Sequence, residues 1–259
     1  MRLKISSLFS VLLVLVFWSA SNGQSPERNT VYGPNEKLKF QMYYGIINAG
    51  EVVMTLEPSY FEGMRVLHAV ATGYTTGLAN RLFRIYDVYE SFMDPETGLP
   101  VKAIRNISES NYRYYNEVLY HRDSNTVTSQ LSGVHEVPPG IMDMVSAIYK
   151  FRDQINTSRL RPGDVFEIKT YFSDKVYPVV IRYRGTETIR TRKGRFHALK
   201  FSPVSEPGRV FSSEDDITLW LSNDRNRVPL RVSLNMVLGS IRADLIEANG
   251  LRHDLIEAN

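Results

Sequence analysis

The stretch Trp220–Leu234, WLSNDRNRVPLRVSL, determines the fold expected for this chain. Its second part alternates apolar and polar residues, and the apolar positions are Val228, Leu230, Val232 and Leu234. The residues ahead of it alternate too, with Ile217, Leu219 and Leu221 on one face and Thr218 and Trp220 on the other. Such alternation is typical of an antiparallel strand with one face on a core and one face in water. The stretch therefore predicts two strands of one sheet.

The link between these two strands has the chemistry of a tight turn. Asp224 can accept hydrogen bonds from its own backbone two residues on. Pro229 lies near the start of the returning strand, where a proline costs no ladder bond. Residues 89–103 have the same order of a strand, an aspartate, a short link and a proline. Asp94 and Pro100 take the positions of Asp224 and Pro229. The likeness predicts two related halves, about 30–136 and 160–259, joined by a helix.

Alternation with period two recurs along most of the chain from Lys37 onward. Further strands are expected at 37–44, 50–57, 65–74, 83–93, 100–108, 112–121, 126–132, 164–173, 176–185, 187–192, 196–202 and 215–222. Short turn sequences separate them. Many evenly spaced strands predict a mainly β fold, an antiparallel curved sheet that forms a half-barrel, barrel or roll.

One segment departs from this period. Ile141, Val145, Ile148 and Tyr149 are spaced as on one face of a helix. Asp143 near the start and Arg152 near the end suit the helix dipole. The spacing predicts one amphipathic helix near 141–154, which plugs or caps the sheet.

The first residues have the order of a secretory signal peptide. Arg2 and Lys4 precede the apolar run of residues 8–18, which is too short to span a bilayer, and small and polar residues follow. Cleavage is expected after Ser21 or Gly23, and the latter leaves 24–259 as a single β-rich domain. The sequence has no cysteine, so neither acylation nor disulfides are expected. We therefore expect an exported, periplasmic, soluble protein that is not integral to the membrane.

Charge gives no reason to expect a nucleic-acid partner. Two of the 31 basic residues lie in the signal peptide, which leaves 29 against 28 acidic ones. A nearly neutral mature chain lacks the basic surface that nucleic acid requires.

The C-terminus repeats DLIEAN at 244–249 and 254–259, with Asn249-Gly250 between the copies. Asn-Gly is a strong hairpin signal, so a terminal hairpin is one interpretation. A recent local duplication is the other.

Signatures of catalysis are missing from the sequence, which has no thiol nucleophile, nucleophile elbow or zinc motif. The five histidines are scattered singly, so no metal site and no cofactor are expected. An acidic cluster, Glu214, Asp215, Asp216 and Asp224, is the best candidate for acid/base chemistry. Strand spacing separates Asp224 from the others by ~20 Å, so we expect solvated turns and no catalytic residue.

Aromatic residues are the more suggestive candidates for ligand contact. The candidates are Trp220, Tyr44, Tyr112, Tyr114 and Tyr115. Tyr112 and Tyr114 share one strand face and Tyr115 takes the other, so one aromatic face can line a cavity or stack on a sugar. Core packing is the competing use of the same residues.

Five separated blocks, at 35–52, 86–110, 143–152, 160–168 and 211–245, resemble Domain of Unknown Function family 3108. The resemblance implies an exported, β-rich bacterial protein without established activity, and it carries no catalytic residues. The hairpin WLSNDRNRVPLR is also similar to hairpins of envelope proteins of the lipoprotein-carrier type, which are half-barrels that hold acyl chains.

Three functions follow as hypotheses. The first is a non-enzymatic envelope protein that binds a hydrophobic or amphipathic ligand, such as a lipid or glycolipid. The second is a structural or assembly partner of the outer membrane or cell wall. The third is a hydrolase acting on envelope glycan or lipid.

Overall fold

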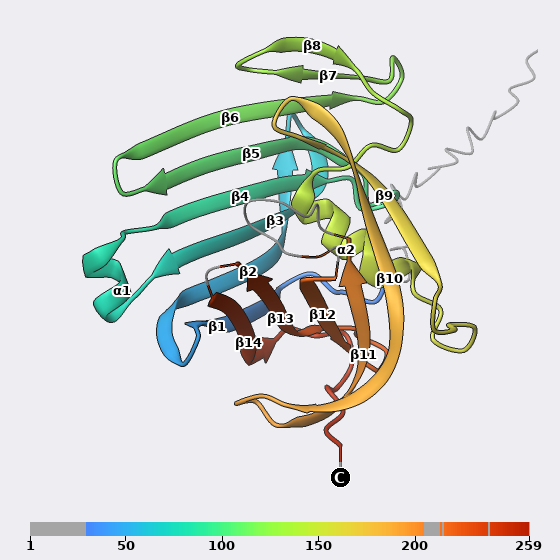
Figure 1. Ribbon diagram of the computed structural model, residues 1–259. Coiled ribbons are helices and arrows are strands. Elements are labelled where there is room, and N and C mark those ends of the chain that lie inside the picture. The colour runs from blue at the N-terminus through green and yellow to red at the C-terminus, as the bar shows by residue number, and fades with distance from the viewer. Residues whose placement is uncertain (1–29, 205–212, 214, 238, 259) are drawn as a thin grey trace, which may run out of the picture.

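One antiparallel sheet of 14 strands accounts for most of the fold (Figure 1). It is seen in a computed structural model that describes residues 30–204, 213, 215–237 and 239–258. The first run of strands is β1 (Glu36–Tyr44), β2 (Ile47–Phe61), β3 (Met64–Thr75), β4 (Tyr86–Met93), β5 (Pro100–Glu109), β6 (Tyr112–His121), β7 (Thr126–Ser129) and β8 (Gly133–Glu136). The second run is β9 (Val165–Phe172), β10 (Lys175–Arg190), β11 (Arg195–Pro203), β12 (Ile217–Ser222), β13 (Pro229–Met236) and β14 (Gly239–Asn249).

The two runs join where the first strand meets the last. The order across the sheet is β8-β7-β6-β5-β4-β3-β2-β1-β14-β13-β12-β11-β10-β9. β1 pairs with β14, and Met42 lies opposite Ala243. The sheet curves so that its two arms, the first run of strands and the second run, face each other. It does not close, because β8 and β9 are not paired with one another. The prediction of a mainly β, curved antiparallel sheet is confirmed.

The opening stretch forms the hairpin β12–β13. Ile217 lies opposite Leu234, and Leu219 lies opposite Val232, so their apolar side chains share one face. Trp220 lies opposite Arg231 on the other face.

Helix α2 (Met144–Gln154) lies between the two arms of the sheet (Figure 1). It starts three residues later than predicted because Asp143 is its N-cap. The Asp143 carboxylate accepts from the backbone N–H groups of Val145 (2.7 Å) and Ser146 (3.0 Å). Met142, just before the cap, is extended and forms a parallel bridge with Thr170 of β9. The linker thereby occupies part of the gap between the arms.

Both long sides of α2 are apolar, so the helix is buried between two groups of side chains. Val145 and Tyr149 join a cluster with β1–β4 and β10–β14. Ala147 and Phe151 join a second cluster with β9–β12. The helix is thus packed inside the curved sheet.

Several boundaries differ from the predictions for identifiable reasons. The strands expected at 176–185 and 187–192 are one strand, β10, which continues through a register shift between Tyr183 and Gly185. The strand expected at 83–93 begins at Tyr86, because the one-turn helix α1 (Gly77–Leu82) precedes it. Neither α1 nor β8 was predicted, since both segments are too short to show a period.

The prediction of a terminal hairpin is wrong. The first DLIEAN copy lies in β14, between β1 and β13, and residues 251–258 form no strand. Gly250 does turn the chain, with φ of 65°. The tail then crosses to β11, where the backbone N–H of Ala258 donates to the carbonyl of Arg195 (2.7 Å). Asn249-Gly250 is therefore a turn without a returning strand.

The predicted signal peptide lies outside the described residues. Among the described residues, no helix is both long enough and apolar enough to cross a membrane. The two related halves remain a prediction, and both belong to one continuous sheet.

Candidate ligand-binding cavity

A cavity of about 480 Å³ lies between α2 and the concave face of the sheet. Of the 21 described residues that line it, Arg152 alone is charged and the other 20 are apolar. The strands contribute Phe40, Met42, Val52, Met54, Ile168, Val179, Ile181, Pro203, Ile217, Leu219, Leu221, Pro229, Val232, Leu234, Ile241 and Ala243. The helix contributes Met144, Ala147, Ile148, Phe151 and Arg152.

The lining follows from the two periodicities of the sequence. On β12, alternate residues point the same way, so Ile217, Leu219 and Leu221 all face the cavity. On α2, residues three and four apart share one side, so Met144, Ala147, Ile148 and Phe151 form a stripe along it. The concave face therefore encloses a space that these side chains do not fill.

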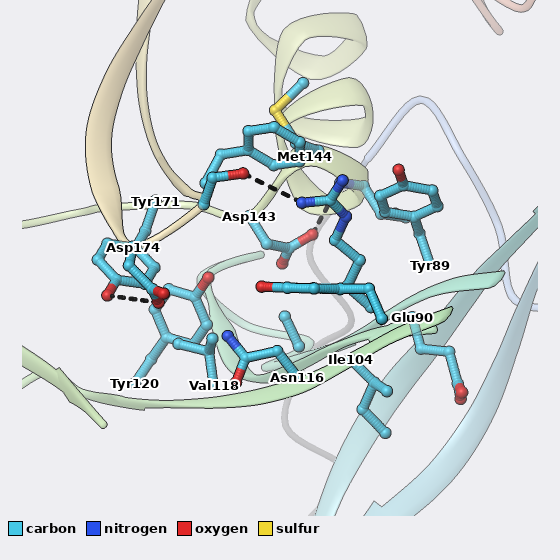
Figure 2. A pocket seen from close by; sticks show the side chains of 16 residues that line it. Tyr89, Glu90, Ile104, Asn116, Val118, Tyr120, Asp143, Met144, Tyr171 and Asp174 are labelled. Carbon is cyan, nitrogen blue, oxygen red and sulfur yellow. Dashed lines mark hydrogen bonds between the residues drawn. The ribbon is translucent and has the colours of Figure 1, made fainter. Parts of the chain in front are cut away.

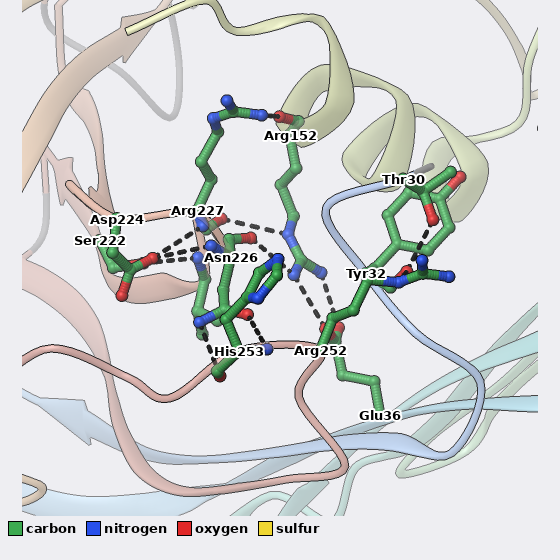
Figure 3. Close-up of polar contacts among 11 residues, drawn as sticks. Thr30, Tyr32, Glu36, Arg152, Ser222, Asp224, Asn226, Arg227, Arg252 and His253 are labelled. Atoms are coloured by element: carbon green, nitrogen blue, oxygen red, sulfur yellow. Dashed lines mark hydrogen bonds and ion pairs between the residues drawn. The ribbon is translucent and has the colours of Figure 1, made fainter. Parts of the chain in front are cut away.

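Arg152, a lining residue, forms a buried ion pair with Glu36 at one end of the cavity, and Figure 3 shows the pair. The Arg152 guanidinium donates to both carboxylate oxygens of Glu36, at 2.6 and 2.9 Å. It also donates to the backbone carbonyls of Asn226 (3.0 Å) and Arg227 (3.1 Å). Burial by itself lowers the pKa of Arg152, but the Glu36 charge and its hydrogen bonds outweigh burial and raise it. The pair joins β1, α2 and the β12–β13 turn, and it leaves Arg152 fully engaged.

The β12–β13 turn beside this pair is built on Asp224, as predicted (Figure 3). One carboxylate oxygen of Asp224 accepts from the backbone N–H groups of Asn226 (2.9 Å) and Arg227 (3.1 Å). The Asn226 side-chain amide then donates to the carbonyl of His253 in the C-terminal tail (3.0 Å). Asp94 begins its turn in the same way, accepting from the backbone N–H of Thr97 at 2.7 Å. Both aspartates are thus structural.

The other end of the cavity is exposed to solvent. Leu234 and Ile241 lie opposite each other near the ends of β13 and β14, two residues from the β13–β14 turn, and Ile241 also lies opposite Tyr44 of β1. Both are half-buried, and Ile148 of α2 is 38% exposed. By contrast Phe40, Leu221 and Pro229, toward the Arg152 end, are buried. The cavity therefore has a closed floor and an open mouth.

Four of the five aromatic candidates, Trp220, Tyr44, Tyr112 and Tyr115, are not among the residues that line the cavity. Trp220 is on the opposite face of β12, where its indole N–H donates to Glu187 and its ring lies near the Lys200 ammonium. Tyr115 is exposed and donates to Glu117. Tyr44 and Tyr112 are exposed at strand ends. The structure does not bring these side chains together, and their role in ligand contact stays a prediction.

Tyr114 lines a second, smaller cavity of about 50 Å³ at the N-terminus of α2 (Figure 2). The Arg105 guanidinium lies over the rings of Phe172 (4.5 Å) and Tyr114 (4.9 Å), and it donates to the Ser173 hydroxyl (3.1 Å). These contacts attach the tip of the β9–β10 hairpin to β5 and β6. Tyr114 thus stabilises the approach of the two arms through a cation–π contact.

The acidic cluster is dispersed. Glu214 lies outside the described residues. Asp215 pairs with Arg184, and Asp216 accepts from the Ser213 backbone N–H (2.8 Å), while Asp224 serves its own turn. Within the described part of the chain, no group of three or more His, Cys, Asp and Glu residues could hold a metal ion.

Sequence reasoning missed the pair that closes the cavity. Glu36 and Arg152 are 116 positions apart. The sequence pattern relates Arg152 only to the helix dipole, and Glu36 is not among the candidate residues. One signal was present, because Arg152 follows Ile148 by four residues and so lies on the apolar side of the helix. A cation there must be satisfied by a partner.

Comparisons with known proteins place the fold and the family. A structure titled a beta-barrel-like protein of Domain of Unknown Function DUF1849 from Brucella abortus superposes with a TM-score of 0.55 at 7% identity, covering 83% of this chain and 97% of that one. A DUF1089 family protein from Pseudomonas aeruginosa gives a TM-score of 0.32 at 8% identity, covering 77% and 90%. No curated protein matches this chain in sequence.

The family described as "Protein of unknown function (DUF3108)" matches residues 39–246. The match includes the strands from β1 to β14 and helix α2. The chain therefore belongs to the DUF3108 family.

Proposed function

We propose that this protein is an exported, non-enzymatic envelope protein that holds a hydrophobic or amphipathic ligand, such as a lipid or glycolipid, in the cavity between α2 and the sheet. One observation carries the proposal, namely the apolar cavity of about 480 Å³. The expectation of export rests on the N-terminal leader.

The size of the cavity argues against a simple packing defect. The cavity holds about 480 Å³ and opens to solvent at its mouth, and small-molecule sites occupy ~300–1,000 Å³. A space of this size and form suits a ligand.

The lining selects the ligand chemistry. Among the described residues that line the cavity, no side chain offers a free donor or acceptor, since the guanidinium of Arg152 is engaged by Glu36 and two carbonyls. A buried polar group of a ligand would therefore lose its hydrogen bonds to water without replacement. Hydrocarbon suffers no such loss, and each buried methylene contributes about 0.8 kcal/mol. The apolar part of the ligand fits inside, and a polar end fits at the mouth near Leu234 and Ile241.

Two neighbouring residues of β13 provide a matched test. Val232→Trp places an indole in the cavity, whereas Ser233→Trp places the same ring on the opposite, half-buried face. Protein purified from its native envelope is extracted with organic solvent, and the extract is analysed by mass spectrometry. We expect a stoichiometric lipid-like compound from the wild type and from Ser233→Trp, and a strongly reduced amount from Val232→Trp. A wild-type protein that carries nothing and takes up no lipid when one is offered would refute the proposal.

A further inference from the structure

Exposed apolar side chains gather on turns at one end of the sheet, the end at which Leu234 and Ile241 mark the cavity mouth. We define the loop rim as residues 44–47, 76–86, 110–113, 237 and 239, which link β1 to β2, β3 to β4, β5 to β6 and β13 to β14. Nine of the 19 large exposed apolar side chains of the described residues lie on it. Ile46 is 97% exposed and Leu82 is 79% exposed. Figure 1 shows α1 and the β5–β6 turn on the same side of the molecule.

Backbone hydrogen bonds join these turns into one continuous edge. The N–H of Gly45 donates to the carbonyl of Ser240 (2.9 Å), and the N–H of Thr76 donates to that of Ala49 (3.0 Å). At the far side, the N–H of Ser110 donates to the carbonyl of Arg84 (2.6 Å). The exposed side chains therefore protrude from a connected rim and not from independent loops.

Helix α1 shows the clearest departure from an ordinary surface. Leu78 and Leu82 are four residues apart and so share one side of the helix, and both are exposed. No residue of α1 is buried. A surface helix normally turns its apolar side to the core. Here the leucines face solvent, and Phe83 directly after the helix is exposed as well.

The charge of the rim is of one sign. It contains Arg81, Arg84 and Arg113 and no acidic residue. Within the described part of the chain, no ion pair engages Arg81 or Arg84. Asp87 and Glu109 adjoin the rim on β4 and β5. Protruding apolar tips with arginine and tyrosine between them are the features of a protein that inserts into the interface of an anionic bilayer.

We propose that the loop rim docks this protein on the surface of a bilayer that contains anionic lipids. Ile46, Leu78, Leu82 and Phe83 enter the interface, and the arginines lie at the level of the lipid phosphates. The cavity mouth, beside Tyr44 and the β13–β14 turn, then faces the membrane. Docking extends the proposed function but needs only the rim, whether or not the cavity holds a ligand. A second copy of this chain or another protein would need a broad complementary surface, whereas the rim is one sheet edge from which individual side chains protrude.

Sedimentation with vesicles tests the proposal on the full mature chain. The vesicles contain either phosphatidylglycerol with phosphatidylethanolamine or phosphatidylcholine alone. Ile46→Glu and Leu82→Glu should each weaken binding to the anionic vesicles about ten-fold or more, since each removes one inserted apolar side chain. The double variant Arg81→Gln and Arg84→Gln should remove most of the preference for anionic vesicles, and added salt should weaken wild-type binding.

Met64→Glu and Ile256→Glu are the matched controls. Met64 is 50% exposed and Ile256 is 64% exposed, and both lie at the opposite end of the sheet, near the β2–β3 turn and the Asp224 turn. They should bind vesicles as the wild type does. All four glutamate variants change exposed positions, so their thermal unfolding midpoints should match the wild type.

Three results would overturn the proposal. They are wild-type protein that stays in solution with every vesicle, rim variants that bind as tightly as the controls, and dimers that dissociate on rim substitution without any vesicle binding. The cavity variant Val232→Trp should still dock, so vesicle binding without lipid retention would remove the proposed ligand and leave the docking surface intact.

Discussion

Replacing Glu36 by glutamine tests whether one buried ion pair holds the closed end of the cavity together. The side chain of Glu36 is 1% exposed and that of Arg152 is 0% exposed, and two hydrogen bonds of 2.6 and 2.9 Å join them. Glutamine keeps the shape of the side chain but removes the charge. It therefore leaves the Arg152 guanidinium buried without a counter-ion.

The expected cost is large because no water can replace the lost charge. Breaking a buried pair by removing one partner costs about 3–5 kcal/mol. For a domain of this size, each 1 kcal/mol lowers the thermal midpoint by ~2–4 °C. Glu36→Gln should therefore lower the midpoint by roughly 6–20 °C. Replacing both partners, as Glu36→Leu with Arg152→Met, should restore much of this loss, since no buried charge remains unpaired.

Urea denaturation followed by circular dichroism measures these differences as free energies of unfolding. The control is Asp215→Asn, which removes the same kind of charge from the Arg184–Asp215 pair, whose side chains are 36% and 52% exposed. A surface pair of this kind contributes about 0–1 kcal/mol. If Glu36→Gln costs no more than Asp215→Asn, the pair does not hold this end of the cavity and the reasoning from burial is wrong.

Three further substitutions test the local structure. Asp143→Ala removes the N-cap of α2 and should lower the free energy of unfolding by about 1–2 kcal/mol, measured by urea denaturation. Asp224→Ala leaves the backbone N–H groups of Asn226 and Arg227 without their acceptor and should cost about 1–3 kcal/mol in the same assay, and a loss below a few tenths would contradict the turn assignment. Burial raises the pKa of Asp94, but hydrogen bonds from Thr97 and Glu96 and the nearby charge of Arg122 together outweigh burial and lower it, so the charged form stabilises the fold. That contribution to stability is fully present above the unfolded-state pKa near 3.8, and it is lost as the pH falls through the folded-state pKa. The stability advantage of the wild type over Asp94→Asn should therefore shrink in acid and not at neutral pH.

The strands and the helix could be predicted because their patterns are local. Period-two alternation places Ile217, Leu219 and Leu221 on one face, and that face lines the cavity. Spacing of three and four residues predicts the helix, and the side chain of Asp143 explains its start. The turn aspartates were also predictable, since their hydrogen bonds reach only two or three residues along the chain.

Contacts between distant parts of the chain could not be predicted in this way. The first strand, β1, pairs with the last strand, β14. The sequence of neither strand indicates which strand it pairs with. For the same reason a terminal hairpin was one interpretation of the last residues, whereas β14 pairs with β1 on one side and β13 on the other. The pairing of Glu36 with Arg152 could not be predicted either, because the two residues meet only in the folded chain.

The cavity is the feature that sequence pattern was least able to reveal. An apolar strand face predicts burial against something, and a filled core and an open cavity require the same alternation. The difference depends on how far α2 stands from β12–β14. Trp220 is the predicted ligand contact in the opening hairpin, but its neighbours Leu219 and Leu221 line the cavity.

Titration with a naturally fluorescent polyene fatty acid tests the central claim most directly, because the probe reports entry into an apolar site. Wild-type protein, freed of bound lipid, should bind one molecule of probe per chain, and an unlabelled fatty acid should displace it. Ser233→Trp should bind the probe like the wild type, whereas Val232→Trp should lose most of the affinity while its thermal unfolding midpoint shows that it is folded. Equal binding by the two tryptophan variants, or no saturable binding by the wild type, would contradict the account.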